Sequence, residues 1–198
     1  MFFYWLTKIL FGALAKVLFR LKVEGLENLP KEGGFILAAN HASSLDPFII
    51  IAAIPRYMRW LVIYEYYDLW YLRRLLRWMG LIRVENSLPR EAFRTLLQGG
   101  IVGLFPEGRR TWDGRLGRAR RGAVSLARRT SCPVVPLAIT GAFAALPRTR
   151  KLLKLHPVTV RIGPPLSFPN IADKGADNER IDRENTRKMM QRIAQLLC

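Results

Sequence analysis

The sequence FILAANHASSLDP, residues 35–47, is predicted to join a strand to a helix through a polar turn. The apolar run Phe35–Ala39 predicts a buried strand, because a strand covered on both faces is continuously apolar rather than alternating. Pro47 suits the first position of a helix, and Asp46 suits its N-terminal cap. A strand that is followed at once by a helix is the repeating unit of sheets with parallel strands.

The rest of the chain repeats this alternation, without an internal repeat or a second domain. Short apolar runs predict further strands at residues 59–64, 81–84, 101–105, 134–139 and 158–162. Helices are predicted between them at residues 47–54, 69–79, 90–98 and 122–129, with a last one at 179–197. The pattern therefore predicts the α/β class, with a mostly parallel sheet flanked by helices on both faces.

The chain has 198 residues, of which 50% are apolar and two are cysteines. A chain of this length can bury a sizeable core, which excludes both intrinsic disorder and a disulfide-stapled miniprotein. Cys132 and Cys198 are predicted to be free thiols in a reducing compartment. We expect a single α/β domain at residues 23–198, preceded by a distinct segment at residues 1–22.

This N-terminal segment, MFFYWLTKILFGALAKVLFRLK, is predicted to form an amphipathic helix. It differs from a signal peptide because Lys8 interrupts the apolar stretch, and its charge-free run at residues 9–15 is too short to span a bilayer. Its basic residues fall on one side of the helix: Lys8, Lys16, Arg20 and Lys22. Aromatic residues cluster at positions 2–5, which is typical of a helix that lies in the membrane interface. The alternative is a terminal helix packed on the protein core.

The formal net charge of +17 predicts an anionic partner. Most of the positive charge lies in residues 56–94, 107–129 and 148–161. Nucleic acid, an acidic membrane surface and a phosphorylated substrate all fit this charge, but the apolar N-terminal helix serves no purpose on DNA. A membrane-associated protein without a nucleic-acid partner is the favoured interpretation. A basic nucleic-acid-binding protein is the alternative.

The helix predicted at residues 69–79 has a similar character. Three arginines share one of its faces, leucines share the opposite face, and tryptophan and tyrosine flank the boundary. This composition is typical of a helix on a membrane surface and equally of an ordinary surface helix.

The side chains best suited to chemistry are His41 and Asp46. Histidine can accept a proton near neutral pH, and a carboxylate on its other ring nitrogen fixes the tautomer. Asn40 and His41 follow one predicted strand, and the cluster Pro106–Arg110 follows another, so both belong at the carboxyl edge of the sheet, where ligands usually bind. The alternative is that Asp46 only caps the helix and His41 only fills the turn.

Other chemistries lack their sequence patterns. The chain contains no G-x-S-x-G elbow, no phosphate-binding loop of the G-x-x-x-x-G-K-[ST] type and no G-x-G-x-x-G run. Two histidines and two distant cysteines do not supply an ordinary zinc site, and His156 is predicted to be structural. We therefore predict neither a metal nor a cofactor.

Four short blocks follow one another along the chain: Asn40–Asp46 (NHASSLD), Gly80–Ile82 (GLI), Phe105–Thr111 (FPEGRRT) and Val135–Ile139 (VPLAI). In order and spacing they resemble the blocks of the membrane-bound glycerophospholipid acyltransferases, whose patterns include His-x4-Asp and FPEG-x-R. The resemblance covers roughly residues 20–165. Among members of the family, the chain resembles the 1-acyl-glycerol-3-phosphate, or lysophosphatidic acid, acyltransferases.

The resemblance implies an O-acyltransferase that forms no covalent acyl-enzyme. It implies that His41 takes the proton from an acceptor hydroxyl and that Asp46 orients His41. The acceptor-binding block corresponds to Glu107, Gly108 and Arg110, and we add Arg109 to this substrate-binding set. The implied partners are membrane lipids, a lysophospholipid acceptor, and acyl-CoA or acyl-carrier protein as donor, with the enzyme monotopic on the cytoplasmic face.

Two positions depart from the family pattern. Arg109 stands where many relatives carry a small hydroxyl residue, and Asn86 stands where relatives commonly carry an arginine that helps to hold the acceptor phosphate. We expect Arg109 to replace that charge, with lysophosphatidate as the acceptor. Another lysolipid acceptor is the alternative, and a membrane-bound scaffold with a degenerate site is a further one.

Overall fold

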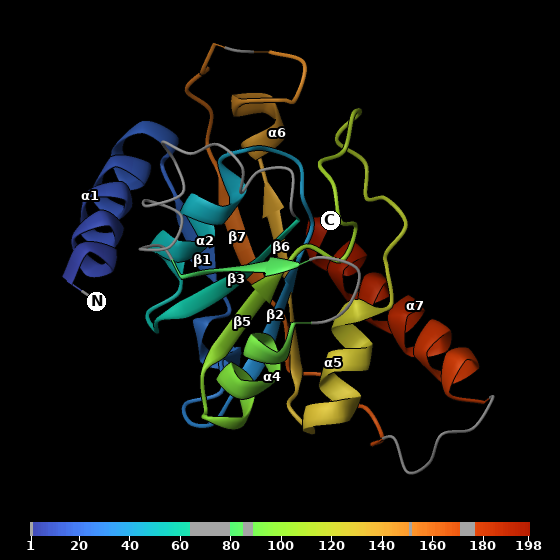
Figure 1. Ribbon diagram of the computed structural model, residues 1–198. Helices are drawn as coiled ribbons and strands as arrows, with labels where there is room; N and C mark the ends of the chain where they lie inside the picture. The colour runs from blue at the N-terminus through green and yellow to red at the C-terminus, as the bar shows by residue number, and fades with distance from the viewer. Residues whose placement is uncertain (1, 64–79, 85–88, 151, 171–176) are drawn as a thin grey trace.

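The computed structural model describes residues 2–63, 80–84, 89–150, 152–170 and 177–198 (Figure 1). Within these residues the strands form one seven-stranded sheet. The strands are β1 (Lys22–Glu24), β2 (Phe35–Ala39), β3 (Met58–Ile63), β4 (Leu81–Val84), β5 (Ile101–Leu104), β6 (Val134–Thr140) and β7 (Thr159–Ile162). The helices are α1 (Phe2–Phe19), α2 (Asp46–Ala53), α4 (Arg90–Leu97), α5 (Gly122–Thr130), α6 (Ala142–Ala145) and α7 (Asp177–Leu197), with a short 3-10 helix at Leu26–Asn28.

The spatial order of the strands is β1-β7-β6-β2-β5-β3-β4. The central strand β2 pairs in parallel with β5 on one side and with β6 on the other. Strands β3 and β4 extend the parallel part, while β7 is antiparallel to β6 and parallel to β1. The predicted α/β fold with a mostly parallel sheet is confirmed.

Helices cover both faces of the sheet, which explains why all five residues of β2 are buried. Phe35, Leu37 and Ala39 belong to a core shared with α1 and α2. Ile36 and Ala38 point to the opposite core, which they share with α4, α5 and α7. Side chains that alternate between two apolar layers require the continuously apolar strand sequence seen at residues 35–39.

Most predicted elements agree with the structure to within one or two residues. Two short elements had not been predicted: α6, with four residues, and β1, with three residues that include Lys22. Lys22 was expected in the N-terminal helix, but that helix ends at Phe19, and Lys22 instead pairs with Thr159 of β7. The predicted helix at 69–79 and Asn86 lie outside the described residues.

Helix α1 packs on α2 through one face. Tyr4, Ala15 and Phe19 are buried, and the Phe11 ring stacks on that of Phe48 with 5.1 Å between their centroids. The opposite face leaves large apolar side chains exposed to solvent: Leu6, Ile9, Leu10, Leu14 and Val17. None of the helices that the structure describes is long and apolar enough to cross a membrane.

The expectation that Lys8 shares the basic side of α1 is wrong. Its Nζ atom donates a hydrogen bond to the carbonyl of Ile54, at the end of α2, at 2.5 Å, and lies 4.6 Å from the centre of the Trp5 ring. Burial accordingly lowers the pKa of Lys8. Lys16 and Arg20 remain on the exposed side of the helix. One of the four basic residues assigned to the basic side, Lys8, therefore forms its contacts within the protein.

Candidate active site

The candidate site lies at the carboxyl ends of β2 and β5. These strands are parallel neighbours, with Ala38 opposite Leu104, so the segments that follow them leave the sheet side by side. The backbone N–H of His41 donates a hydrogen bond to Glu107 Oε1 at 2.8 Å. The predicted meeting of the two polar clusters is confirmed.

The carboxylate of Asp46 gathers the turn that precedes α2. Its Oδ2 atom lies 2.9 Å from His41 Nδ1 and accepts the backbone N–H groups of Ala42 and Ser43, both at 2.7 Å. The prediction that Asp46 caps the helix is wrong, because α2 begins at Asp46 itself and has no side-chain cap. The carboxylate faces back into the turn instead, and its Oδ1 atom is buried without a hydrogen bond to the described residues.

The imidazole of His41 is fixed in tautomer and in plane. Because a carboxylate only accepts hydrogen bonds, Nδ1 carries the proton in the neutral imidazole, and Nε2 then carries the lone pair. The ring stacks on Phe105, with 3.8 Å between centroids and 9° between planes, and Phe105 stacks in turn on Trp60. The His41 side chain remains 17% exposed, so its ring is not sealed from solvent.

Glu107 uses both of its carboxylate oxygens inside the protein. Oε1 accepts the His41 N–H, and Oε2 accepts the backbone N–H of Gly117 at 2.7 Å. A Cβ at Gly117 would lie 2.8 Å from Oε2, so a glycine permits this close approach. Burial raises the pKa of Glu107, and the two backbone hydrogen bonds partly oppose that shift. The carboxylate ties the turn that contains His41 to the loop between β5 and α5.

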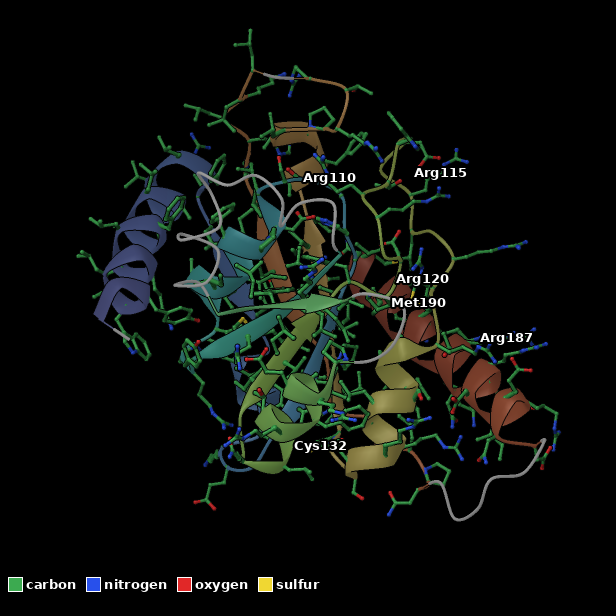
Figure 2. The ribbon with its side chains drawn as sticks, viewed as in Figure 1. Arg110, Arg115, Arg120, Cys132, Arg187 and Met190 are labelled. Carbon is green, nitrogen blue, oxygen red and sulfur yellow. The ribbon has the colours of Figure 1, made fainter. Side chains whose placement is uncertain are left out.

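That loop carries the other predicted site residues. Gly108 has a φ of +70°, and a Cβ at this position would meet the Arg120 side chain at 3.0 Å. Arg109 is exposed and Arg110 is half-buried; Figure 2 shows Arg110 at the same end of the sheet as α6. Further arginines along the loop are exposed: Arg115, Arg118, Arg120 and Arg121. The loop thus presents a dense positive charge beside the His41 turn.

Sequence reasoning assigned no role to three residues that build the site. Asn40 exchanges two side-chain hydrogen bonds with the backbone of Ile139 in β6. Ser43 Oγ donates to the carbonyl of Leu146 and accepts the Leu45 N–H. Phe105 supplies the stacking face for His41. Asn40 and Ser43 could have been noticed in the sequence as polar residues that follow a buried strand. The residues that all three contact could not, because those contacts depend on the tertiary fold.

The arrangement suits the abstraction of a proton by His41 Nε2. The buried carboxylate of Asp46 can stabilise the imidazolium that forms, and the arginine-rich loop can attract an anionic substrate. Within the described ranges, no three His, Cys, Asp or Glu side chains gather into a set that could hold a metal ion.

The sequence is similar to those of known proteins. Residues 20–140 match the profile of the family described as Acyltransferase. A 1-acyl-sn-glycerol-3-phosphate acyltransferase of Limnanthes douglasii is 30% identical over an alignment of 157 residues, and the match covers 74% of this chain and 54% of that protein. One of Bacillus subtilis (strain 168) is 28% identical over an alignment of 182 residues, and the match covers 89% of this chain and 87% of that protein. The chain spans about half the length of the Limnanthes relatives that it matches.

Among solved structures, the chain resembles the 1-acyl-sn-glycerophosphate acyltransferase PlsC of Thermotoga maritima. The TM-score is 0.74 at 24% sequence identity, and the match covers 95% of this chain and 78% of that one. This similarity is one of fold.

Proposed function

Because the chain belongs to the acyltransferase family, we propose that it transfers a fatty acyl group from a thioester donor to the hydroxyl of a lysophospholipid. The preferred acceptor is 1-acyl-glycerol-3-phosphate, and another lysolipid is the alternative. The observation that carries the proposal is the pairing of His41 Nδ1 with Asp46 Oδ2 beside a loop rich in arginine.

In the proposed reaction, His41 is the general base. Nε2 accepts the proton of the acceptor hydroxyl as its oxygen forms a bond to the thioester carbonyl carbon. Asp46 keeps the proton on Nδ1 and stabilises the positive charge on the ring. The tetrahedral intermediate then expels the thiolate by breaking the C–S bond, and Nε2–H returns the proton to the sulfur. His41 is regenerated without an acyl-enzyme.

The arginines of the loop between β5 and α5 are the proposed phosphate ligands. A guanidinium can hold a phosphate through two parallel charge-assisted hydrogen bonds. We assign this role to Arg110 and Arg109, on the segment that follows Glu107. Gly108 allows the turn between Glu107 and the two arginines. Glu107 acts as a positioning residue because its oxygens are already bonded to backbone N–H groups.

A membrane-interface position supports the same function. The acceptor and the acyl chain both partition into lipid, and the exposed apolar face of α1 offers a surface that can enter the bilayer. We propose a monotopic enzyme on the cytoplasmic face, moored by α1. The donor is acyl-CoA or acyl-carrier protein, and the positive charge around the site fits either anionic carrier.

The test is a panel of lysolipids, which includes lysophosphatidate, lysophosphatidylglycerol and lysophosphatidylcholine, each assayed with acyl-CoA and with acyl-carrier protein. We expect transfer to be fastest with lysophosphatidate, to be abolished in His41→Ala, and to persist in the matched variant His156→Ala. Near wild-type turnover in His41→Ala would remove the mechanism. Failure of every donor and acceptor pair in the folded protein would remove the function.

A further inference from the structure

The loop between α6 and β7 exposes three leucines to solvent. Leu152, Leu153 and Leu155 are 79%, 47% and 62% exposed, respectively. Large apolar side chains that cluster on one exposed loop mark a contact surface, because scattered ones would be spread over the molecule. This cluster lies outside the catalytic turn and outside α1.

The loop is held in place by its own polar residues. The guanidinium of Arg150 donates to the carbonyls of Ala144 at 2.7 Å, Ala145 at 3.1 Å and Leu152 at 3.1 Å. The backbone N–H of Lys154 donates to the same Ala145 carbonyl at 2.9 Å. These bonds fasten the base of the loop to α6. The leucines are therefore presented outward by a built structure.

The leucine surface adjoins α1 through Leu155. The backbone N–H of Val158 donates to the carbonyl of Phe19, the last residue of α1, at 2.8 Å. Val17 and Leu18 from α1 line one cleft of about 220 Å³ together with Leu155 and Pro157 from the loop. Figure 1 shows the loop extending beyond α6 at the end of the sheet where α1 terminates. The two apolar surfaces can thus meet one flat partner together.

The charge around the leucines identifies that partner. From Pro147 to Arg161 the sequence contains no acidic residue, and Arg148, Arg150 and Lys154 lie among the leucines. The Arg148 guanidinium lies 4.0 Å from the centre of the Trp112 ring, which is 59% exposed. Exposed leucine and tryptophan interspersed with basic residues suit a bilayer whose head groups are anionic.

We propose that the loop between α6 and β7 is a second membrane contact, which enters the head-group region of an anionic bilayer through Leu152, Leu153 and Leu155. Ser43 Oγ of the catalytic turn donates to the carbonyl of Leu146, where this loop begins, at 2.7 Å. Contact at the loop therefore holds the catalytic turn at the lipid surface. The benefit to catalysis rests on the proposed function, whereas the lipid contact itself does not.

The first test is the partition of the full chain onto vesicles of phosphatidylcholine and phosphatidylglycerol, measured by co-sedimentation. The double variant Leu152→Ser/Leu155→Ser should lower the partition coefficient by about tenfold or more, since each leucine loses burial in lipid. The matched control is Leu26→Ser/Leu97→Ser, which removes two exposed leucines elsewhere and should change partition less than about twofold. Equal partition of the two double variants would overturn the proposal.

A second measurement places a probe on the loop itself. An environment-sensitive fluorophore is attached at Leu153→Cys, or at Leu97→Cys as control, after Cys132 and Cys198 are replaced by alanine. Emission at position 153 should shift to the blue on vesicles and be quenched by brominated lipid, while position 97 should not respond. A silent label at 153 on vesicles that bind the protein would overturn the proposal.

The two measurements separate this inference from the proposed function. Both are repeated with His41→Ala, which removes catalysis by the proposed mechanism but keeps the leucines. Lipid contact at position 153 should persist in His41→Ala. The same contact in a folded chain that retains His41 and yet transfers no acyl group to any acceptor of the panel would support the inference and remove the function. Acyl transfer by a protein whose label at position 153 stays in water would support the proposed function and overturn the inference about the loop.

Discussion

The polar clusters around His41 and around Arg128 each contain a buried charged side chain, Asp46 and Arg128 respectively, yet they differ in which nitrogen atoms are already bonded. At Arg128, which is 2% exposed in its side chain, the guanidinium donates to Pro169 O at 2.8 Å, Asp182 Oδ1 at 2.6 Å and Asn178 Oδ1 at 2.9 Å. These bonds tie α5 to α7. At His41, Nδ1 pairs with Asp46 and the ring stacks on Phe105, but Nε2 forms no hydrogen bond with the residues that the structure describes. Both clusters bury polar groups, but only the His41 cluster leaves a basic nitrogen for chemistry.

The largest effect that would sharpen this contrast is expected from Asp46→Asn. An amide oxygen can still accept the N–H groups of Ala42 and Ser43, so the turn should keep its shape. The negative charge that stabilises the imidazolium is lost, and the tautomer of His41 is no longer enforced. We expect acyl transfer to fall by about a hundred- to ten-thousand-fold, as measured by kcat with saturating donor and acceptor.

The control for Asp46→Asn is its thermal unfolding curve. The activity loss should occur in a protein whose melting temperature is close to that of the wild type. If Asp46→Asn lost stability but kept turnover in the fraction that remains folded, Asp46 would serve only to stabilise the fold, as the ion pair of Arg128 does.

The next largest effect is expected from Arg128→Met. Removal of the guanidinium leaves Asp182 and Asn178 facing an apolar side chain in a buried place. Breaking a buried ion pair in this way costs about 3–5 kcal/mol of unfolding free energy, which urea denaturation would measure. The turnover of the protein that remains folded should be unchanged.

The neighbouring exposed residue supplies the matched variant. Arg129→Met, one position along α5, removes the same charge from an exposed site and should change stability by less than about 0.5 kcal/mol. A comparable loss of stability in Arg128→Met and Arg129→Met would show that the buried cluster contributes nothing special to the attachment of α7.

The two clusters also differ in how far the sequence predicts them. His41 and Asp46 are five residues apart on a strand-to-helix turn, so local patterns predicted their pairing. Arg128 and Asp182 are 54 residues apart and lie on two different helices. Their ion pair depends on how α5 and α7 pack, which no local pattern encodes.

The same distinction explains the successes and errors of the fold prediction. Strand β2 was predicted to its end residues because burial on both faces leaves a continuous apolar run. Strand β1 has only three residues and is ordered by its pairing with β7, so its own sequence carries little signal. Lys8 was assigned to the basic side of α1 because helical periodicity cannot reveal that the carbonyl of Ile54 lies within reach.

A smaller effect is expected from Arg109→Ser, which tests whether the positive charge of Arg109, beside the His41 cluster, binds the acceptor phosphate. If Arg109 holds the acceptor phosphate, the loss of a charge-assisted hydrogen bond costs about 1.5–3 kcal/mol. The KM for lysophosphatidate should then rise by roughly ten- to a hundredfold while the donor KM stays near its wild-type value.

Arg115→Ser is the matched variant for this measurement. Arg115 is exposed on the same loop, and its ion pair with Asp113 is long, at 3.9 Å. It should leave the acceptor KM nearly unchanged. A similar rise in both variants would indicate a general effect of loop charge, and no rise in either would leave Arg110 as the main phosphate ligand.

The smallest effect concerns Glu107 in the His41 cluster, whose two carboxylate oxygens each accept a backbone hydrogen bond. Two backbone hydrogen bonds favour its charged form and burial disfavours it; burial is the stronger influence, so its pKa lies above the ordinary value of 4.5. The folded protein then holds this proton more tightly than the unfolded chain does. The stability that Glu107 contributes is therefore complete below about pH 4.5 and is lost as the pH rises through the folded pKa.

The measurement is the unfolding free energy of the wild type minus that of Glu107→Gln, followed upward from pH 4.5. The difference should decline with a slope no steeper than about 1.4 kcal/mol per pH unit, the limit for one proton. Because the glutamine does not titrate, subtraction removes the pH dependence of every other group that the substitution leaves undisturbed. A difference that grew with pH would mean that the hydrogen bonds from His41 and Gly117 outweigh burial. Glu107 would then stabilise the fold in its charged form, as the ion pair at Arg128 does.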